Sequence, residues 1–236
     1  MTIRLLTILL VSALITPVHS AAAAERGKDT KKRVEVSSTQ HIEFISRGVI
    51  RIQKSFGELF VDGWDKNEVE VTVTKAIKAS PDTPEDQERA RRKLETVKVT
   101  SSRQSADTIL ISSSLPFHKN FDLVYRIKVP RESDLFIKHS IGEVTVGGVL
   151  GELEITSHIG EITVNLQDGR EYNIDAKVKI GEVQSAFSGK SKRSYLVSEK
   201  FSRDERTESH RVYLRVGIGE IAINKNIGKV AEKPPQ

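Results

Sequence analysis

Cysteine is absent from the 236-residue chain, and methionine and tryptophan occur once each. Without cysteine the protein forms no disulfide and no thiolate metal site, so its stability depends on strand hydrogen bonds and a hydrophobic core. Aromatic residues make up only 6% of the chain, which leaves few rings on which bases could stack. Nucleic acid is therefore excluded as an expected partner, and the net charge of +5 indicates only that acidic partners are tolerated.

Long apolar runs are also scarce, and the single long one lies at the start of the chain. It extends from Leu5 to Val18, after Arg4 and before the small residues Ser20 to Ala24, which is typical of a secretory signal peptide. The run is shorter than the roughly 20 residues that span a membrane. We expect cleavage after Ser20 or, preferably, after Ala24. The protein is then exported to the periplasm or the cell exterior, with no transmembrane segment after signal removal.

The rest of the chain predicts one domain between two flexible ends. We expect a signal peptide at 1–24, a charged flexible linker at 25–33, a single domain at 34–228 and a flexible tail at 229–236. Within the domain, short runs of alternating apolar and polar residues predict strands with one buried face.

One segment breaks the strand pattern and predicts a helix over about 83–96. Thr83 is a suitable N-cap and Pro84 a suitable first helical residue. Ala90, Leu94 and Val97 form a narrow apolar stripe, so we expect the helix to lie on the outside of the sheet.

An Ile-Gly-Glu-aliphatic unit recurs in the second half of the chain, beginning at Ile141, Ile159, Ile180 and Ile218. The glycines are 18, 21 and 38 residues apart, and the last interval indicates a copy that lost its signature within 190–210; a weaker copy occupies 56–59. A period near 20 residues is typical of a solenoid with stacked rungs. The predicted fold is mostly β, a right-handed β-solenoid-like stacked-strand domain with one peripheral α-helix. A β-sandwich is the alternative.

These glycine-centred rungs, together with the segment from Ser55 to Val71, the helix and hairpin that follow it, and Val129-Pro130 at the end of a strand, resemble the putative adhesin family of bacterial envelope proteins. The resemblance covers about Val34 to Asn226 and depends on glycine and aliphatic spacing. It implies an extracytoplasmic, toast-rack or β-helix-like domain of unknown function, and it supplies no catalytic residues.

No catalytic motif stands out in the sequence. Gly-x-Ser-x-Gly and His-Glu-x-x-His are absent, and Gly189-Lys190-Ser191 lacks the earlier glycine of a phosphate-binding loop. His139 and His158 precede two of the repeated corners, but their offsets differ, so we expect hydrogen-bonded or solvated histidines rather than a metal pair. We therefore predict no enzyme activity, no catalytic residues and no cofactor.

Two sets of charged residues are candidate binding features. The acidic set is Glu143, Glu161, Glu182 and Glu220. Stacked rungs would place these like charges about 4.8 Å apart. Solvent, lysines or a hard cation such as calcium could relieve their repulsion. The basic set, a candidate contact for an anionic lipid headgroup or polysaccharide, is Lys190, Lys192, Arg193, Arg203, Arg206 and Arg211.

The leading functional hypothesis is an exported, non-enzymatic interaction or scaffold protein of the cell envelope, with an adhesin-like or stress-associated role. Its partner would be an envelope protein or a polyanionic surface component. The alternative is a glycan-acting or glycan-binding β-helix protein, which for hydrolysis would need two carboxylates across a groove.

Overall fold

The computed structural model describes residues 34–77, 83–114, 121–194, 197–204 and 209–226. The predicted signal peptide, the linker at 25–33, the tail at 229–236 and Arg206 lie outside these residues. No helix within the described ranges is long and apolar enough to cross a membrane. In chain order, the elements are β1 (Glu35–Glu43), β2 (Val49–Trp64), β3 (Glu68–Ile77), α1 (Pro84–Glu95), β4 (Lys98–Ser105), β5 (Thr108–Ser114), β6 (Phe121–Pro130), β7 (Asp134–Gly147), β8 (Leu153–Gln167), β9 (Tyr172–Ser185), β10 (Lys190–Ser194), β11 (Ser198–Arg203) and β12 (His210–Asn226).

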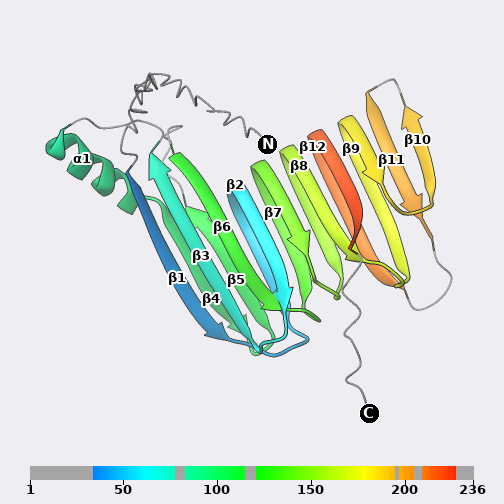
Figure 1. Ribbon diagram of the computed structural model, residues 1–236, viewed down its shortest axis with the longest axis horizontal. Coiled ribbons are helices and arrows are strands. Elements are labelled where there is room, and N and C mark those ends of the chain that lie inside the picture. Colours follow the sequence, from blue (N-terminus) through cyan, green and yellow to red (C-terminus); the bar gives the residue numbers. More distant parts are fainter. Residues whose placement is uncertain (1–33, 78–82, 115–120, 195–196, 205–208, 227–236) are drawn as a thin grey trace, which may run out of the picture. The chain divides into compact units, whose positions relative to one another are not determined.

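The strands pair in the order β1-β3-β6-β2-β7-β8-β12-β9-β11-β10 (Figure 1). β4 pairs with β5, which also pairs with β2. The central strands β2, β7, β8, β12 and β9 are all parallel, whereas the outer pairs β1-β3, β3-β6, β9-β11 and β11-β10 are antiparallel. An antiparallel β-sandwich has no such parallel centre. The prediction of a mostly-β, stacked-strand fold is therefore confirmed, and the sandwich alternative is wrong.

A glycine occupies the same register position on each of the strands β7, β8, β12 and β9. Gly160 has φ of 129°, and the glycines at the same register on the neighbouring strands have similar values. A Cβ atom on Gly160 would lie 1.9 Å from the carbonyl oxygen of Gly142. No other residue fits this position without a shift of the backbone, because it combines positive φ with such a close approach. The glycine of the repeat therefore forms the corner of each rung.

Aliphatic side chains fill the core at aligned positions on both sides of the corner. Along each rung, alternate residues point inward, as expected of strands with one buried face, and the predicted inward orientation of Val144, Ile162 and Ile221 is confirmed. Burying one such side chain stabilises the fold by about 1.5–3 kcal/mol. The aligned buried residues are Leu135, Leu153, Val212 and Ile174 before the corner, and Val144, Ile162, Ile221 and Val183 after it.

The order of the rungs differs from their order in the sequence. β12 lies between β8 and β9, so that Gly219 pairs with both Gly160 and Gly181. The expected lost copy within 190–210 is not a rung: its described residues include the antiparallel hairpin of β10 and β11, which extends the edge of the sheet beyond β9. The interval of 38 residues therefore reflects this hairpin excursion and the return of the chain into the sheet, rather than two repeats.

The single helix of the described residues has the predicted ends. The Thr83 hydroxyl oxygen accepts a hydrogen bond from the Asp86 backbone N–H at 3.1 Å, and Pro84 is the first helical residue. Ala90 and Leu94 are buried, whereas most of the other side chains are exposed. The helix contacts β1 and β3 at the end of the sheet away from the repeated corners (Figure 1).

Candidate functional site

The predicted glutamate ladder is present and has five members rather than four. Glu143 pairs with Glu161, Glu161 with Glu220, and Glu220 with Glu182. Glu58 of the weaker copy pairs with Glu143 and extends the row onto β2. The sequence contained this signal, but the poor match of Phe56-Gly57-Glu58 to the repeat kept it out of the predicted set.

The immediate partners of the ladder are few. Thr163 Oγ1 donates to Glu161 Oε1 at 3.0 Å, and Gln184 Nε2 donates to Glu182 Oε1 at 2.8 Å. Among the described residues, no Lys or Arg forms an ion pair with the five carboxylates, and no group of three potential ligands could hold a metal ion. A cation on this ladder stays a prediction.

A row of exposed isoleucines lies beside the glutamates, and the sequence analysis did not identify it. Ile141 pairs with Ile159, Ile159 with Ile218, and Ile218 with Ile180. Their exposed fractions lie between 44% for Ile159 and 57% for Ile141. The signal in the sequence was the isoleucine that begins each repeat unit. An aliphatic residue that recurs in a repeat can face solvent instead of the core. We call the isoleucine row and the glutamate row together the corner ridge.

The two histidines near the corners lie on opposite faces and form no metal pair. His139 is 1% exposed, and its Nδ1 lies 2.9 Å from the hydroxyl oxygen of Ser55. Burial lowers the pKa of His139 to about 4, so the ring is neutral at physiological pH. His158 faces outward, with its Nδ1 3.3 Å from the backbone carbonyl oxygen of His139.

The predicted basic set does not form one cluster. Lys190, Lys192 and Arg193 lie on β10, whereas Arg211 lies on β12, which is separated from β10 by β9 and β11. Two of these cations have acidic partners within the fold. Arg193 Nη2 is 3.2 Å from Glu199 Oε2, and Arg211 Nη2 is 3.2 Å from Glu154 Oε2.

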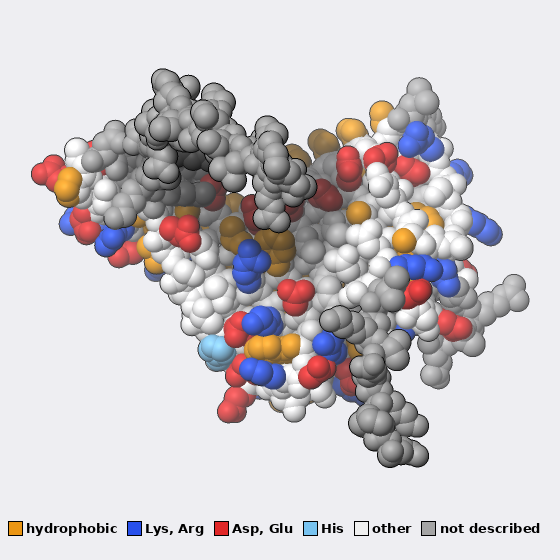
Figure 2. Space-filling model, viewed as in Figure 1, with side chains coloured by type: hydrophobic (Ala, Val, Ile, Leu, Met, Phe, Trp, Pro, Cys, Tyr) orange, Lys and Arg blue, Asp and Glu red, His pale blue; other side chains and the backbone are white. Residues whose placement is uncertain are grey.

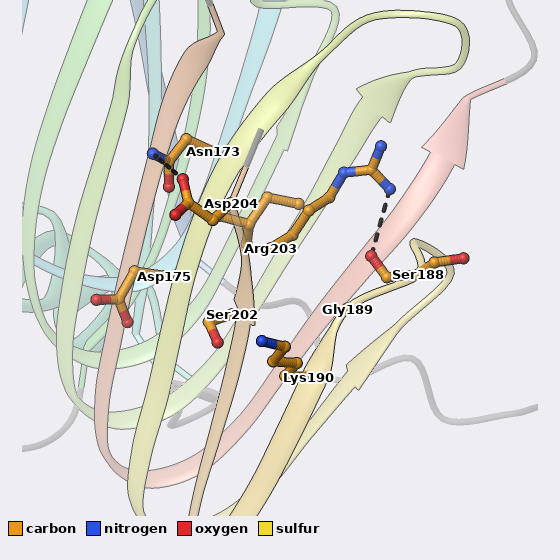
Figure 3. A pocket seen from close by; sticks show the side chains of 9 residues that line it. Asn173, Asp175, Ser188, Gly189, Lys190, Ser202, Arg203 and Asp204 are labelled. Atoms are coloured by element: carbon orange, nitrogen blue, oxygen red, sulfur yellow. Dashed lines mark hydrogen bonds between the residues drawn. The ribbon is translucent and has the colours of Figure 1, made fainter. Parts of the chain in front are cut away.

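An open cavity of about 910 Å³ lies between β9, β11 and the start of β10. Figure 3 shows Asp175, Asp204, Lys190 and Arg203 around it. Asn173 Nδ2 donates to Asp204 Oδ1 at 3.4 Å, and Arg203 Nη1 donates to the Ser188 carbonyl oxygen at 3.3 Å. The cavity therefore has a mixed charge rather than a uniformly basic lining.

Asp175 is held as a carboxylate. Burial alone would raise its pKa, but Arg215 Nη2 at 3.1 Å and Lys200 Nζ at 3.3 Å lower it below its usual value. A glycosidase needs one carboxyl group with a raised pKa as general acid. Asp175 has the opposite shift and is better suited to anchoring the two cations.

A second basic feature becomes visible in the strand register. Lys138, Arg215, Lys177, Lys200 and Lys192 occupy one aligned position across neighbouring strands, interrupted only by Thr156 on β8. We call these five residues the basic row. Because the aligned residues come from segments up to 77 positions apart in the chain, sequence spacing alone could not reveal the row.

Comparison with known proteins defines the class of fold. No family model and no curated protein matches the chain. The chain is similar to the crystal structure of a putative cell adhesion protein from Clostridium sporogenes, with a TM-score of 0.50 and 14% identity over 83% of this chain and 100% of that one. This likeness shows a shared stacked-strand fold, as the family resemblance implied.

Two further solved structures have related names. They are a putative adhesin from Bacteroides fragilis, 11% identical over 80% of this chain and 97% of that one with a TM-score of 0.33, and a putative adhesin from Parabacteroides merdae, 10% identical over 63% and 68% with a TM-score of 0.26. The name of the Clostridium sporogenes structure agrees with the family that the sequence resembles.

Proposed function

We propose that this protein is an exported, non-enzymatic interaction protein of the cell envelope, adhesin-like in role, that binds a protein partner through the corner ridge. The observation that carries this proposal is the row of four isoleucines exposed in register on adjacent strands. Single exposed apolar residues are common on protein surfaces, but contiguous apolar patches mark interaction sites. The name of the structural neighbour from Clostridium sporogenes supports an adhesive role.

The glutamate row defines the chemistry of the partner. Four of the five glutamates lie two residues after an isoleucine, so an apolar line and an acidic line run side by side across the sheet. A complementary surface presents aliphatic side chains flanked by Lys or Arg. The parallel sheet beneath the ridge holds both lines in fixed positions, which lowers the entropy lost on binding.

The carboxyl groups favour binding over glycan hydrolysis. Among the described carboxyl groups, those of Asp107, Glu132 and Asp175 have clearly shifted pKa values, and all three pKa values are lowered. A glycan-acting enzyme would need a carboxyl group shifted upward beside a carboxylate. We therefore place the glycan-acting alternative second.

A binding assay on cell envelopes tests the proposal. The purified exported protein is added to envelopes of the organism that produces it, and bound protein is quantified for wild type and for Ile159→Ser/Ile218→Ser. The control is Ile45→Ser/Val36→Ser, because Ile45 and Val36 are 49% and 40% exposed but lie outside the ridge.

We expect the ridge variant to lose at least tenfold in affinity and the control variant to bind as the wild type does. Protease treatment of the envelopes should abolish the part of the binding that depends on the ridge, since the ridge partner is a protein. Equal binding by all three proteins, with unchanged circular dichroism, would refute the role of the ridge.

A further inference from the structure

We propose that the basic row is a binding site for a linear acidic polysaccharide that lies across the strands. This inference concerns a different surface from the corner ridge, and it does not depend on the ridge having a protein partner. Five of six aligned positions on six neighbouring strands are Lys or Arg. Six strands at about 4.8 Å spacing give a row about 24 Å long.

The row runs along the outer face of the strands. Its members alternate with the buried residues Ile137, Leu214 and Val178, so their side chains point away from the core. Figure 2 shows Lys and Arg side chains over the end of the sheet where β9, β11 and β10 lie, on the right of the view, with Asp and Glu side chains between them. A cationic line on a rigid sheet fits a chain that carries regularly spaced anions.

The cations of the row are only partly neutralised by the fold. Asp175 pairs with Arg215 and Lys200, whereas Lys138, Lys177 and Lys192 have no ion-pair partner among the described residues. Like charges directly opposite each other on neighbouring strands destabilise a sheet. An external polyanion would remove this repulsion when it binds.

A cavity of about 380 Å³ opens beside the centre of the row. It is lined by Lys177, Lys179 and Arg215, together with the outward-facing His158. Gly217 lies in this cavity wall and contributes no side chain; a Cβ there would be 2.4 Å from the His158 carbonyl oxygen. Three cations around one recess provide a place for an anionic group that branches from the linear chain.

The neighbouring residues favour a polysaccharide over a lipid surface. A membrane contact needs cations spread over an area and apolar anchors beside them. The exposed isoleucines lie near the row, but the glutamate row follows them immediately and would repel an anionic membrane. A single polymer chain can follow the basic row without meeting the glutamates.

Glycan binding by the exported full-length protein tests the inference. The probes are polygalacturonate, which has a carboxylate on every sugar, hyaluronate, which has one on every second sugar, and neutral dextran. The row variant is Lys138→Gln/Lys177→Gln/Lys192→Gln. The control variant is Lys66→Gln/Lys93→Gln/Lys98→Gln, which removes three exposed lysines away from the row and so makes the same change in net charge.

We expect polygalacturonate to bind more tightly than hyaluronate, dextran not to bind, and added salt to weaken binding because the contacts are exposed. The row variant should lose at least tenfold in affinity while the control variant loses less than threefold. Equal losses in both variants would mean that only net charge matters and would overturn the site. Binding to anionic phospholipid vesicles in preference to polygalacturonate would overturn the choice of ligand.

Discussion

Acidification should destabilise this protein because His139 is buried as a neutral imidazole. Burial lowers its pKa from 6.5 to about 4. The unfolded chain therefore binds a proton more readily than the folded chain, so the free energy of unfolding is fully retained above about pH 6.5 and falls as the pH drops towards 4. A shift of this size corresponds to a loss of about 3 kcal/mol.

The assay is urea unfolding followed by circular dichroism at several pH values across this window. His139→Val is the matched variant, because Val216 and Val178 occupy the same register position on β12 and β9. Ser55→Ala is added so that the Ser55 hydroxyl is not left buried without its partner.

We expect the double variant to fold at neutral pH and to lose most of the dependence on pH. A small slope should remain from His210, whose pKa burial also lowers. The reasoning is refuted if wild type and double variant lose the same stability between pH 6.5 and 4.

Three other predictions concern the corners, the glutamate row and the N-terminus. Gly160→Ala should lower the free energy of unfolding, measured by thermal melting, by at least about 3 kcal/mol, because the added Cβ would lie 1.9 Å from the Gly142 carbonyl oxygen. Gly169→Ala, where a Cβ would meet nothing within 4 Å, should lower it by about 1 kcal/mol. Equal losses in the two variants would contradict the corner geometry. Glu161→Gln should leave neutral-pH stability equal or a few tenths of a kcal/mol higher, and a calcium-dependent rise in the melting temperature of wild type alone would show instead that the row binds a cation. N-terminal sequencing of protein from an exporting host should begin at Ala21 or Glu25, and an intact Met1 in the envelope fraction would contradict export.

Local features of the fold could be predicted from the sequence because they depend on neighbouring residues. Thr83 and Pro84 mark the start of the helix, and the alternation of apolar residues marks the strands. The Ile-Gly-Glu unit identified the corners because only glycine tolerates that backbone geometry. In the same way, the outward direction of Glu143 followed from the inward direction of Val144.

Long-range pairing could not be predicted in the same way. The position of β12 between β8 and β9 depends on which strand edges pair. The spacing of the repeat gives only distances along the chain, so it does not predict this order. The basic row depends on this order, since Arg215 reaches its place between Thr156 and Lys177 only through it. The predicted basic set followed proximity in the chain instead, and therefore joined Arg211 to residues three strands away.

Engineered disulfides test the strand order on which the corner ridge and the basic row depend. The chain has no cysteine of its own. Cysteine pairs introduced at the exposed isoleucines can therefore form disulfides only with each other, without competition from native thiols. Adjacent strands place aligned Cα atoms about 4.8 Å apart, within disulfide range, whereas strands two apart are about 9.6 Å apart and out of range. Under mild oxidation, mass measurement should find cross-links in Ile159→Cys/Ile218→Cys and in Ile180→Cys/Ile218→Cys, and none in Ile159→Cys/Ile180→Cys. A cross-link in the last variant, without one in the first, would contradict the account.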